Sequence, residues 1–186
     1  MTLSKSMQAL CKARSEYFDD RHESESRTVF SNNGRAVAHT HYGLRVEPCA
    51  DAQAPQLPAK LEKALAEIES LSWDVVGTIS GADLALDVAD AAVEEDAGRP
   101  CPSLSLAPGA VLIASFLRTL FDLRELHDVA IVEVALVDHP KHPISPPPRM
   151  ARFRGVGWTV YYAGAIGCDC DPKCEQRTVN LMAAEK

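Results

Sequence analysis

The sequence predicts an α/β fold in which a mainly parallel sheet is flanked by helices. Strand-like apolar runs alternate with segments of helical periodicity, which is typical of βαβ units. The clearest strand, "DVAIVEVALVD" at 128–138, is an almost continuous apolar run, as expected for a parallel strand buried on both faces. The chain has 186 residues, of which 46% are hydrophobic, and this is enough for one domain with a core.

The individual elements follow from local patterns. The segment 59–71 repeats apolar residues at spacings of three and four with charges between them, which predicts a surface helix. Pro108 suits the first turn of a helix built on the apolar stretch that follows it. In chain order, the predicted elements are helix 2–17, strand 35–40, helix 59–71, strand 82–90, helix 109–123, strand 128–138 and helix 149–167.

Three parts are expected along the chain: an N-terminal helix and polar loop at 1–33, an α/β domain at 34–166, and a cysteine-containing tail at 167–186. In the tail, Cys168, Cys170 and Cys174 either contribute to a zinc site or remain free thiols. The spacing lacks the paired Cys-x-x-Cys form, which favours free thiols.

Charge and hydropathy exclude several classes of partner. The net charge of −7 argues against nucleic acid and against an anionic membrane, because both repel an acidic surface. No apolar run approaches the roughly 20 residues that span a bilayer, and the N-terminus is too polar for a signal peptide. We therefore expect a cytoplasmic protein whose six cysteines are reduced.

Four side chains of metal-ligand or acid type lie where the predicted strands end. In a parallel sheet the carboxyl ends of the strands form the ligand site, and His39, His41, Asp87 and Glu133 would lie there. His39 and His41 are two residues apart on a strand and would face the same side, where Asp87 could join them. Imidazole and carboxylate together suit zinc or manganese. The alternative is two surface histidines and a solvated acidic turn.

The order of four segments resembles the ureohydrolase family of arginases, agmatinases and formiminoglutamases. The segments are "GRAVAHTHYGLR", "LALDVAD", "HDVAIVEVALVDHP" and "PRMARFRGVGWTVYYAGAIG", and the resemblance covers about 34–166. It implies a truncated arginase-like three-layer α/β/α fold. It also implies manganese as cofactor, with His39, His41 and Asp87 at ligand positions and Glu133 facing the guanidinium-like group of a substrate. A structural role for Glu133, as an acid hydrogen-bonded to a loop, is equally compatible with the sequence.

The resemblance implies reduced metal binding and reduced catalytic activity. In the family two manganese ions activate a hydroxide, and neighbouring dications need several carboxylates to offset their repulsion. Here His39, Gly43 and Ala89 stand where the family has aspartates, so manganese is expected to be lost or reduced to one ion. The resemblance thus implies a catalytically impaired binding or regulatory protein, associating with itself or with an intact family member. The alternatives are a metal-dependent hydrolase of linear amidines, of formiminoglutamate, agmatine or arginine type, and a remnant without independent function.

Overall fold

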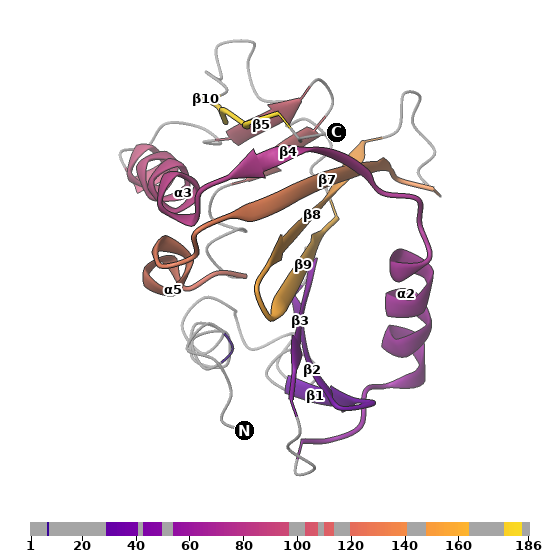
Figure 1. Ribbon diagram of the computed structural model, residues 1–186. Helices are drawn as coiled ribbons and strands as arrows, with labels where there is room; N and C mark the ends of the chain where they lie inside the picture. Colours follow the sequence, from indigo (N-terminus) through magenta and orange to yellow (C-terminus); the bar gives the residue numbers. More distant parts are fainter. Residues whose placement is uncertain are drawn as a thin grey trace.

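The computed structural model describes Met7 and the ranges 29–40, 43–49, 54–96, 103–107, 110–113, 120–140, 148–163 and 177–183. Within these residues, seven strands form one sheet (Figure 1). In spatial order they are β1 (Val29–Asn32), β2 (Arg35–Thr40), β3 (Gly43–Pro48), β9 (Trp158–Tyr162), β8 (Arg149–Gly155), β7 (Val132–Asp138) and β4 (Asp74–Ile79). A smaller sheet has the order β10 (Arg177–Thr178), β5 (Ser103–Ala107) and β6 (Ala110–Ile113).

The prediction of a mainly parallel α/β/α sheet is wrong. Every neighbouring pair in the seven-stranded sheet is antiparallel, and few helices accompany it. The apolar run of β7 was the misleading signal. Val134 and Leu136 face one side of the sheet and Ala135 faces the other, yet all three are buried. In an antiparallel strand that is covered on both faces, polar and apolar residues likewise do not alternate. A continuous apolar run therefore does not determine strand direction.

Local patterns predicted some elements correctly. The strand at 35–40 and the helix at 59–71 are confirmed as β2 and α2 (Ala59–Glu69), and the predicted strand at 128–138 contains β7. The segment predicted as strand 82–90 is instead part of helix α3 (Gly81–Asp96). Its buried Leu84, Val88 and Ala91 recur at spacings of four and three, which is a helical period.

Two predicted helices contain strands instead. Within the predicted helix 149–167, residues 149–162 form the hairpin β8–β9, whose two-residue loop ends in Gly157 at a φ of +78°, a conformation that glycine adopts without strain. In the segment 109–123, residues 110–113 form β6. Of the predicted helix 2–17, Met7 alone lies within the described residues, where it is helical and buried against Val29 and Ala36.

Two hydrophobic clusters cover opposite faces of the main sheet. On one face, α2 contributes Leu65 to a cluster with Leu44 and Tyr161. On the other face, α3 packs against β7, β8 and β9 together with the smaller sheet and the short helix α5 (Leu123–His127). Figure 1 shows α2 on one side of the sheet and α3 and α5 on the other.

Short segments cover parts of both outer edges of the main sheet. Beside β1, the Ser31 amide donates to the Pro55 carbonyl (2.8 Å). Beside β4, Thr78 and Met182 exchange two backbone hydrogen bonds of 2.9 and 2.8 Å. Covered edges offer less backbone for strand addition by another chain. Residues on both sides of 34–166 thus contribute to the sheets, since β1 precedes this range and β10 follows it.

No helix in the described ranges is both long enough and apolar enough to cross a membrane.

Candidate functional site

The structure places two of the predicted metal ligands, His39 and Asp87, on opposite sides of the main sheet. His39 pairs with Leu44 across β2 and β3, so its side chain lies on the face that α2 covers. Asp87 lies on α3, whose buried residues pack against the opposite face. His41 lies outside the described residues, as do Cys168, Cys170 and Cys174. In the part of the chain that the structure describes, no group of three His, Cys, Asp or Glu side chains is placed to hold a metal ion. His39 and Asp87 therefore do not fit the shared manganese site that the resemblance implies.

Glu133 forms an ion pair within the sheet. It is the second residue of β7, and its Oε1 accepts a hydrogen bond from Nη2 of Arg152 on β8 at 3.0 Å. The guanidinium of Arg152 lies 5.4 Å from the centre of the Trp73 ring. The sequence predicted either a substrate contact or a loop contact for Glu133. Neither prediction included Arg152, because a helix was expected at 149–167.

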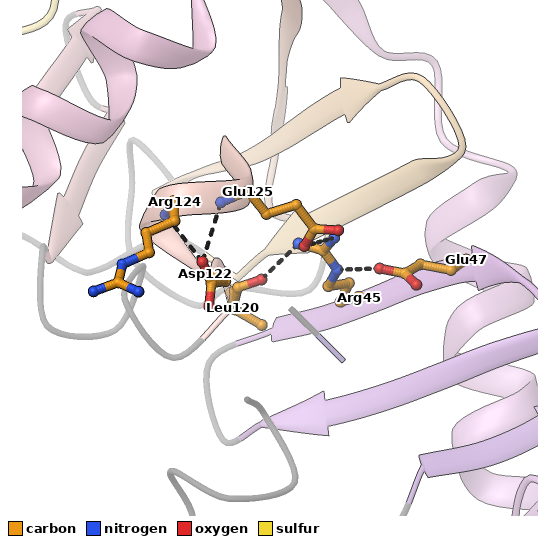
Figure 2. A network of polar contacts seen from close by, with 6 residues as sticks. All are labelled: Arg45, Glu47, Leu120, Asp122, Arg124 and Glu125. Carbon is orange, nitrogen blue, oxygen red and sulfur yellow. Dashed lines mark hydrogen bonds and ion pairs between the residues drawn. The ribbon is translucent and has the colours of Figure 1, made fainter. Parts of the chain in front are cut away.

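The most deeply buried charge in the described residues is Arg45, on the face of β3 that looks away from α2. Its side chain is 1% exposed. Its Nε donates to Glu47 Oε1 at 2.7 Å, and its Nη1 donates to the Leu120 carbonyl at 3.1 Å. Its Nη2 lies 3.6 Å from Glu125 Oε2, which belongs to α5 (Figure 2). A buried guanidinium is tolerated because carboxylates and a carbonyl oxygen surround it.

The Arg45 network positions α5. Asp122 caps this helix by accepting hydrogen bonds from the amides of Arg124 (2.9 Å) and Glu125 (3.1 Å). Glu125 turns toward Arg45, whereas Arg124 extends away from it (Figure 2). The network is internal and satisfied by the protein itself, so we assign it a structural role. One side of α5 is held inside the protein, and its other side is left to line a groove.

An open groove of about 590 Å³ lies between α3 and α5. Its lining residues are Ala82, Asp83, Ala85, Leu86, Ala89, Leu123, Arg124, His127 and Asp128. The four apolar residues from α3 occur at positions i, i+3, i+4 and i+7, so they form one stripe along the helix. Leu86 in this stripe is 58% exposed. A large apolar side chain in an open groove marks a surface suited to binding.

Gly81 fixes the start of α3 against the end of α5. Its amide donates to the Val129 carbonyl at 2.9 Å. A Cβ at this position would collide with the carbonyl oxygens of Leu126 and Val129, so no other residue permits this approach without a shift. The groove therefore lies between two helices whose junction is closely packed.

Helix α3, which forms one wall of the groove, is rich in acidic residues, and of these Asp83 lines the groove. The helix carries no lysine or arginine, and its acidic residues are Asp83, Asp87, Asp90, Glu94, Glu95 and Asp96. Asp83 lies in the first turn of α3, where its amide donates a capping hydrogen bond to Ser80 Oγ at 3.0 Å.

The fold changes the acidity of the Tyr161 phenol by raising its pKa. Burial raises the pKa of the Tyr161 phenol above 10.0, and the nearby Glu69 carboxylate raises it further, against a smaller opposing effect of Arg152, Arg154 and Arg35. The tyrosine is 6% exposed, and its ring lies 5.8 Å from that of Trp73. The phenol is therefore neutral, and able to donate a hydrogen bond, throughout the neutral pH range.

The raised pKa of Tyr161 predicts a loss of stability in alkali. Unfolded tyrosine releases its proton near pH 10, whereas folded Tyr161 keeps it, so the unfolded state binds fewer protons and stability falls as pH rises above about 10. We expect the free energy of unfolding of Tyr161→Phe to approach or exceed that of the wild type between about pH 9 and 11. Urea unfolding of both proteins across this range measures the difference. A difference that is constant with pH would contradict the assignment.

Comparisons with known proteins give no match: no family model fits the chain, and no curated protein or solved structure is detectably similar to it.

Proposed function

We propose that this protein is a binding module whose α3–α5 groove holds a cationic amphipathic helix of a partner protein. The observation that carries the proposal is the apolar stripe of α3, with exposed Leu86, at the base of an open groove beside a helix without basic residues. The apolar face of such a partner would lie in the groove, and its lysines or arginines would face α3. This is the helix-in-groove mode of recognition, in which apolar anchors recur at helical spacing.

The dimensions and chemistry of the groove support an apolar anchor. Its volume lies within the range of about 300–1,000 Å³ that is common for binding pockets. Three of the four α3 residues in the stripe are alanines, namely Ala82, Ala85 and Ala89. Small side chains permit the backbone of a partner helix to come close. Burying Leu86 against a partner would contribute about 1.5–3 kcal/mol.

The charge of α3 supports a basic partner. The whole chain has a net charge of −7, and a single helix carries six of its acidic residues without any basic residue. Complementary charge mainly speeds association and selects the partner. Because Asp83 is exposed to water, the affinity should fall as ionic strength rises. A neutral or acidic helix would gain the apolar contact alone and would meet the repulsion of α3.

The proposal keeps the earlier hypothesis of a binding or regulatory protein but bases it on the groove. The ureohydrolase resemblance supplies no argument here, since the fold that it implied is wrong. Hydrolysis of a linear amidine with manganese stays a prediction without support from the placement of His39 and Asp87. Association with an intact ureohydrolase likewise stays a prediction. We propose the cytosol as the compartment, on the charge and cysteine content of the sequence.

The test is a titration with a synthetic amphipathic helix that has leucines on one face and lysines on the other. We expect saturable binding to the wild type, and about 10- to 100-fold weaker binding to Leu86→Gln, because the main apolar anchor contact is removed. Val156→Gln is the matched control, since Val156 is 95% exposed in the β8–β9 loop and lies outside the groove. Fluorescence anisotropy of the labelled peptide measures the affinities.

Two outcomes would contradict the proposal. One is equal binding of a peptide with the same composition in scrambled order, which cannot form an apolar face. The other is an affinity of Leu86→Gln no lower than that of Val156→Gln. The role of the α3 charge predicts that peptide binding to the wild type weakens as salt is added. The double variant Asp83→Asn with Asp87→Asn should show a smaller salt dependence.

A further inference from the structure

A second surface, on the opposite face of the sheet, has the chemistry of an anion site. Arg152 and Arg154 are two residues apart on β8, so their side chains emerge on the same face. The register pairs Arg152 with Tyr161 and Arg154 with Thr159 on β9. Directly opposite residues of antiparallel strands lie side by side on one face. Four hydrogen-bonding side chains are therefore neighbours there.

Several donors on this surface have no partner. Arg152 Nε is buried and makes no hydrogen bond. Arg154 is exposed and forms no ion pair or hydrogen bond with the described part of the chain. The Tyr161 hydroxyl has no hydrogen bond to any other residue that the structure describes, although the tyrosine is nine-tenths buried. Buried polar groups normally have partners, so the unpaired Arg152 Nε indicates a missing acceptor, and Arg154 and the Tyr161 hydroxyl are available to bind it as well.

The surrounding groups hold these donors in place. Arg152 is fixed by Glu133 Oε1 at 3.0 Å and by the Trp73 ring at 5.4 Å. Trp73 is itself fixed, because its Nε1 donates to the Ile68 carbonyl at 3.1 Å. Arg152 can therefore offer its remaining donors without losing its position. A guanidinium held in this way has less side-chain entropy to lose when an anion binds.

The local charge also favours an anion. The guanidiniums of Arg35, Arg152 and Arg154 lower the pKa of the Tyr161 phenol, as nearby cations do. The Glu69 carboxylate raises it. Counting Glu133 as well, three guanidiniums face two carboxylates, so this surface is positive on a protein whose net charge is −7. An anion would meet repulsion over most of the protein and attraction at this place.

We propose that Arg152, Arg154 and Tyr161 bind a small oxyanion, the carboxylate or phosphate group of a low-molecular-weight ligand. The guanidinium forks present paired N–H groups that match the oxygens of either group. The neutral phenol donates a third hydrogen bond. This site is independent of the α3–α5 groove, which lies on the other face of the sheet.

Calorimetric titrations of the full chain with inorganic phosphate and with acetate test the proposal. We expect saturable binding of at least one anion, reduced about tenfold or more in Arg154→Gln, because a charged hydrogen-bonding group is lost. Tighter binding of phosphate would assign the site to phosphate esters, and tighter binding of acetate would assign it to carboxylates. Arg154→Lys should bind more weakly than the wild type, since it keeps the charge but loses the fork.

Lys60→Gln is the matched control, because it removes one positive charge at an exposed position in the first turn of α2. That position lies about 12 Å along the helix from Ile68, away from the proposed donors. The proposal is overturned if neither anion binds saturably, or if Lys60→Gln weakens binding as much as Arg154→Gln. Arg154 is exposed, so its replacement should leave the fold intact. Thermal unfolding of each variant verifies this.

Discussion

Replacement of Arg45 by methionine is expected to lower the free energy of unfolding by about 3–5 kcal/mol, the range for breaking one partner of a buried ion pair. The change would remove the guanidinium that faces the buried Glu47 carboxylate and donates to the Leu120 carbonyl. It would also release Glu125, which connects α5 to β3. Urea denaturation of the wild type and the variant at neutral pH measures the loss.

The double variant Arg45→Met with Glu47→Leu is the informative control. Removing both charges replaces a buried ion pair by apolar groups, which is often neutral or even stabilising. We therefore expect the double variant to be more stable than Arg45→Met alone. If Arg45→Met costs less than about 1 kcal/mol, or if the double variant is less stable still, the network is not the internal anchor that its geometry indicates.

Replacement of Trp158 by alanine should also cost about 3–5 kcal/mol, as is typical of a large aromatic side chain lost from a core. Trp158 is buried in the larger cluster, 5.4 Å from the Phe121 ring in an edge-on arrangement. Its ring also lies 5.2 Å from the Arg45 guanidinium. The space over Gly155 is filled by the indole, since a Cβ on that glycine would collide with it. The substitution thus opens a cavity and removes a cation–π contact.

Thermal and urea unfolding of Trp158→Ala measure this effect, with Trp158→Phe as the milder control that keeps an aromatic ring. We expect Trp158→Phe to retain part of the lost stability. Because Trp158 and Arg45 are in contact, the two substitutions should not be additive. A Trp158→Ala protein with wild-type stability would contradict the burial on which the account of this core depends.

Local patterns predicted part of the fold. The helical period of 59–71 and the short strand at 35–40 are properties of adjacent residues, and both elements form. The hairpin β1–β2 could also have been predicted from the sequence. Asn33 and Gly34 adopt φ values of 50° and 76°, and Asn-Gly is a strong signal for a two-residue hairpin turn. We read this stretch as part of a polar loop instead.

Strand direction was not predictable from these patterns. A buried apolar strand has the same composition in either direction, so β7 favoured a parallel sheet that does not form. The segment 149–167, which includes Arg152 and Arg154, was predicted to form a helix. In the structure Arg152 and Arg154 lie on the α2-facing side of β8, opposite Tyr161 and Thr159.

The groove was missed because of one secondary-structure error. Reading 82–90 as a strand placed Asp87 at a strand end and concealed the stripe of Ala82, Ala85, Leu86 and Ala89, which is evident only at a helical period. The Arg45 network could not have been predicted from the sequence, since Arg45 and Leu120 are 75 residues apart. Long-range contacts of this kind follow from the register of the whole sheet.

The most direct test of the central claim, that the α3–α5 groove is the binding surface, is a map of amide chemical shifts in the labelled protein during titration with the leucine–lysine helix. We predict shifts that saturate together and centre on Ala82, Leu86, Ala89 and Leu123, with the amides of β8 and β9 beside α2 unchanged. Shifts centred on any other surface, or none at α3 and α5 when the peptide is in excess, would contradict it.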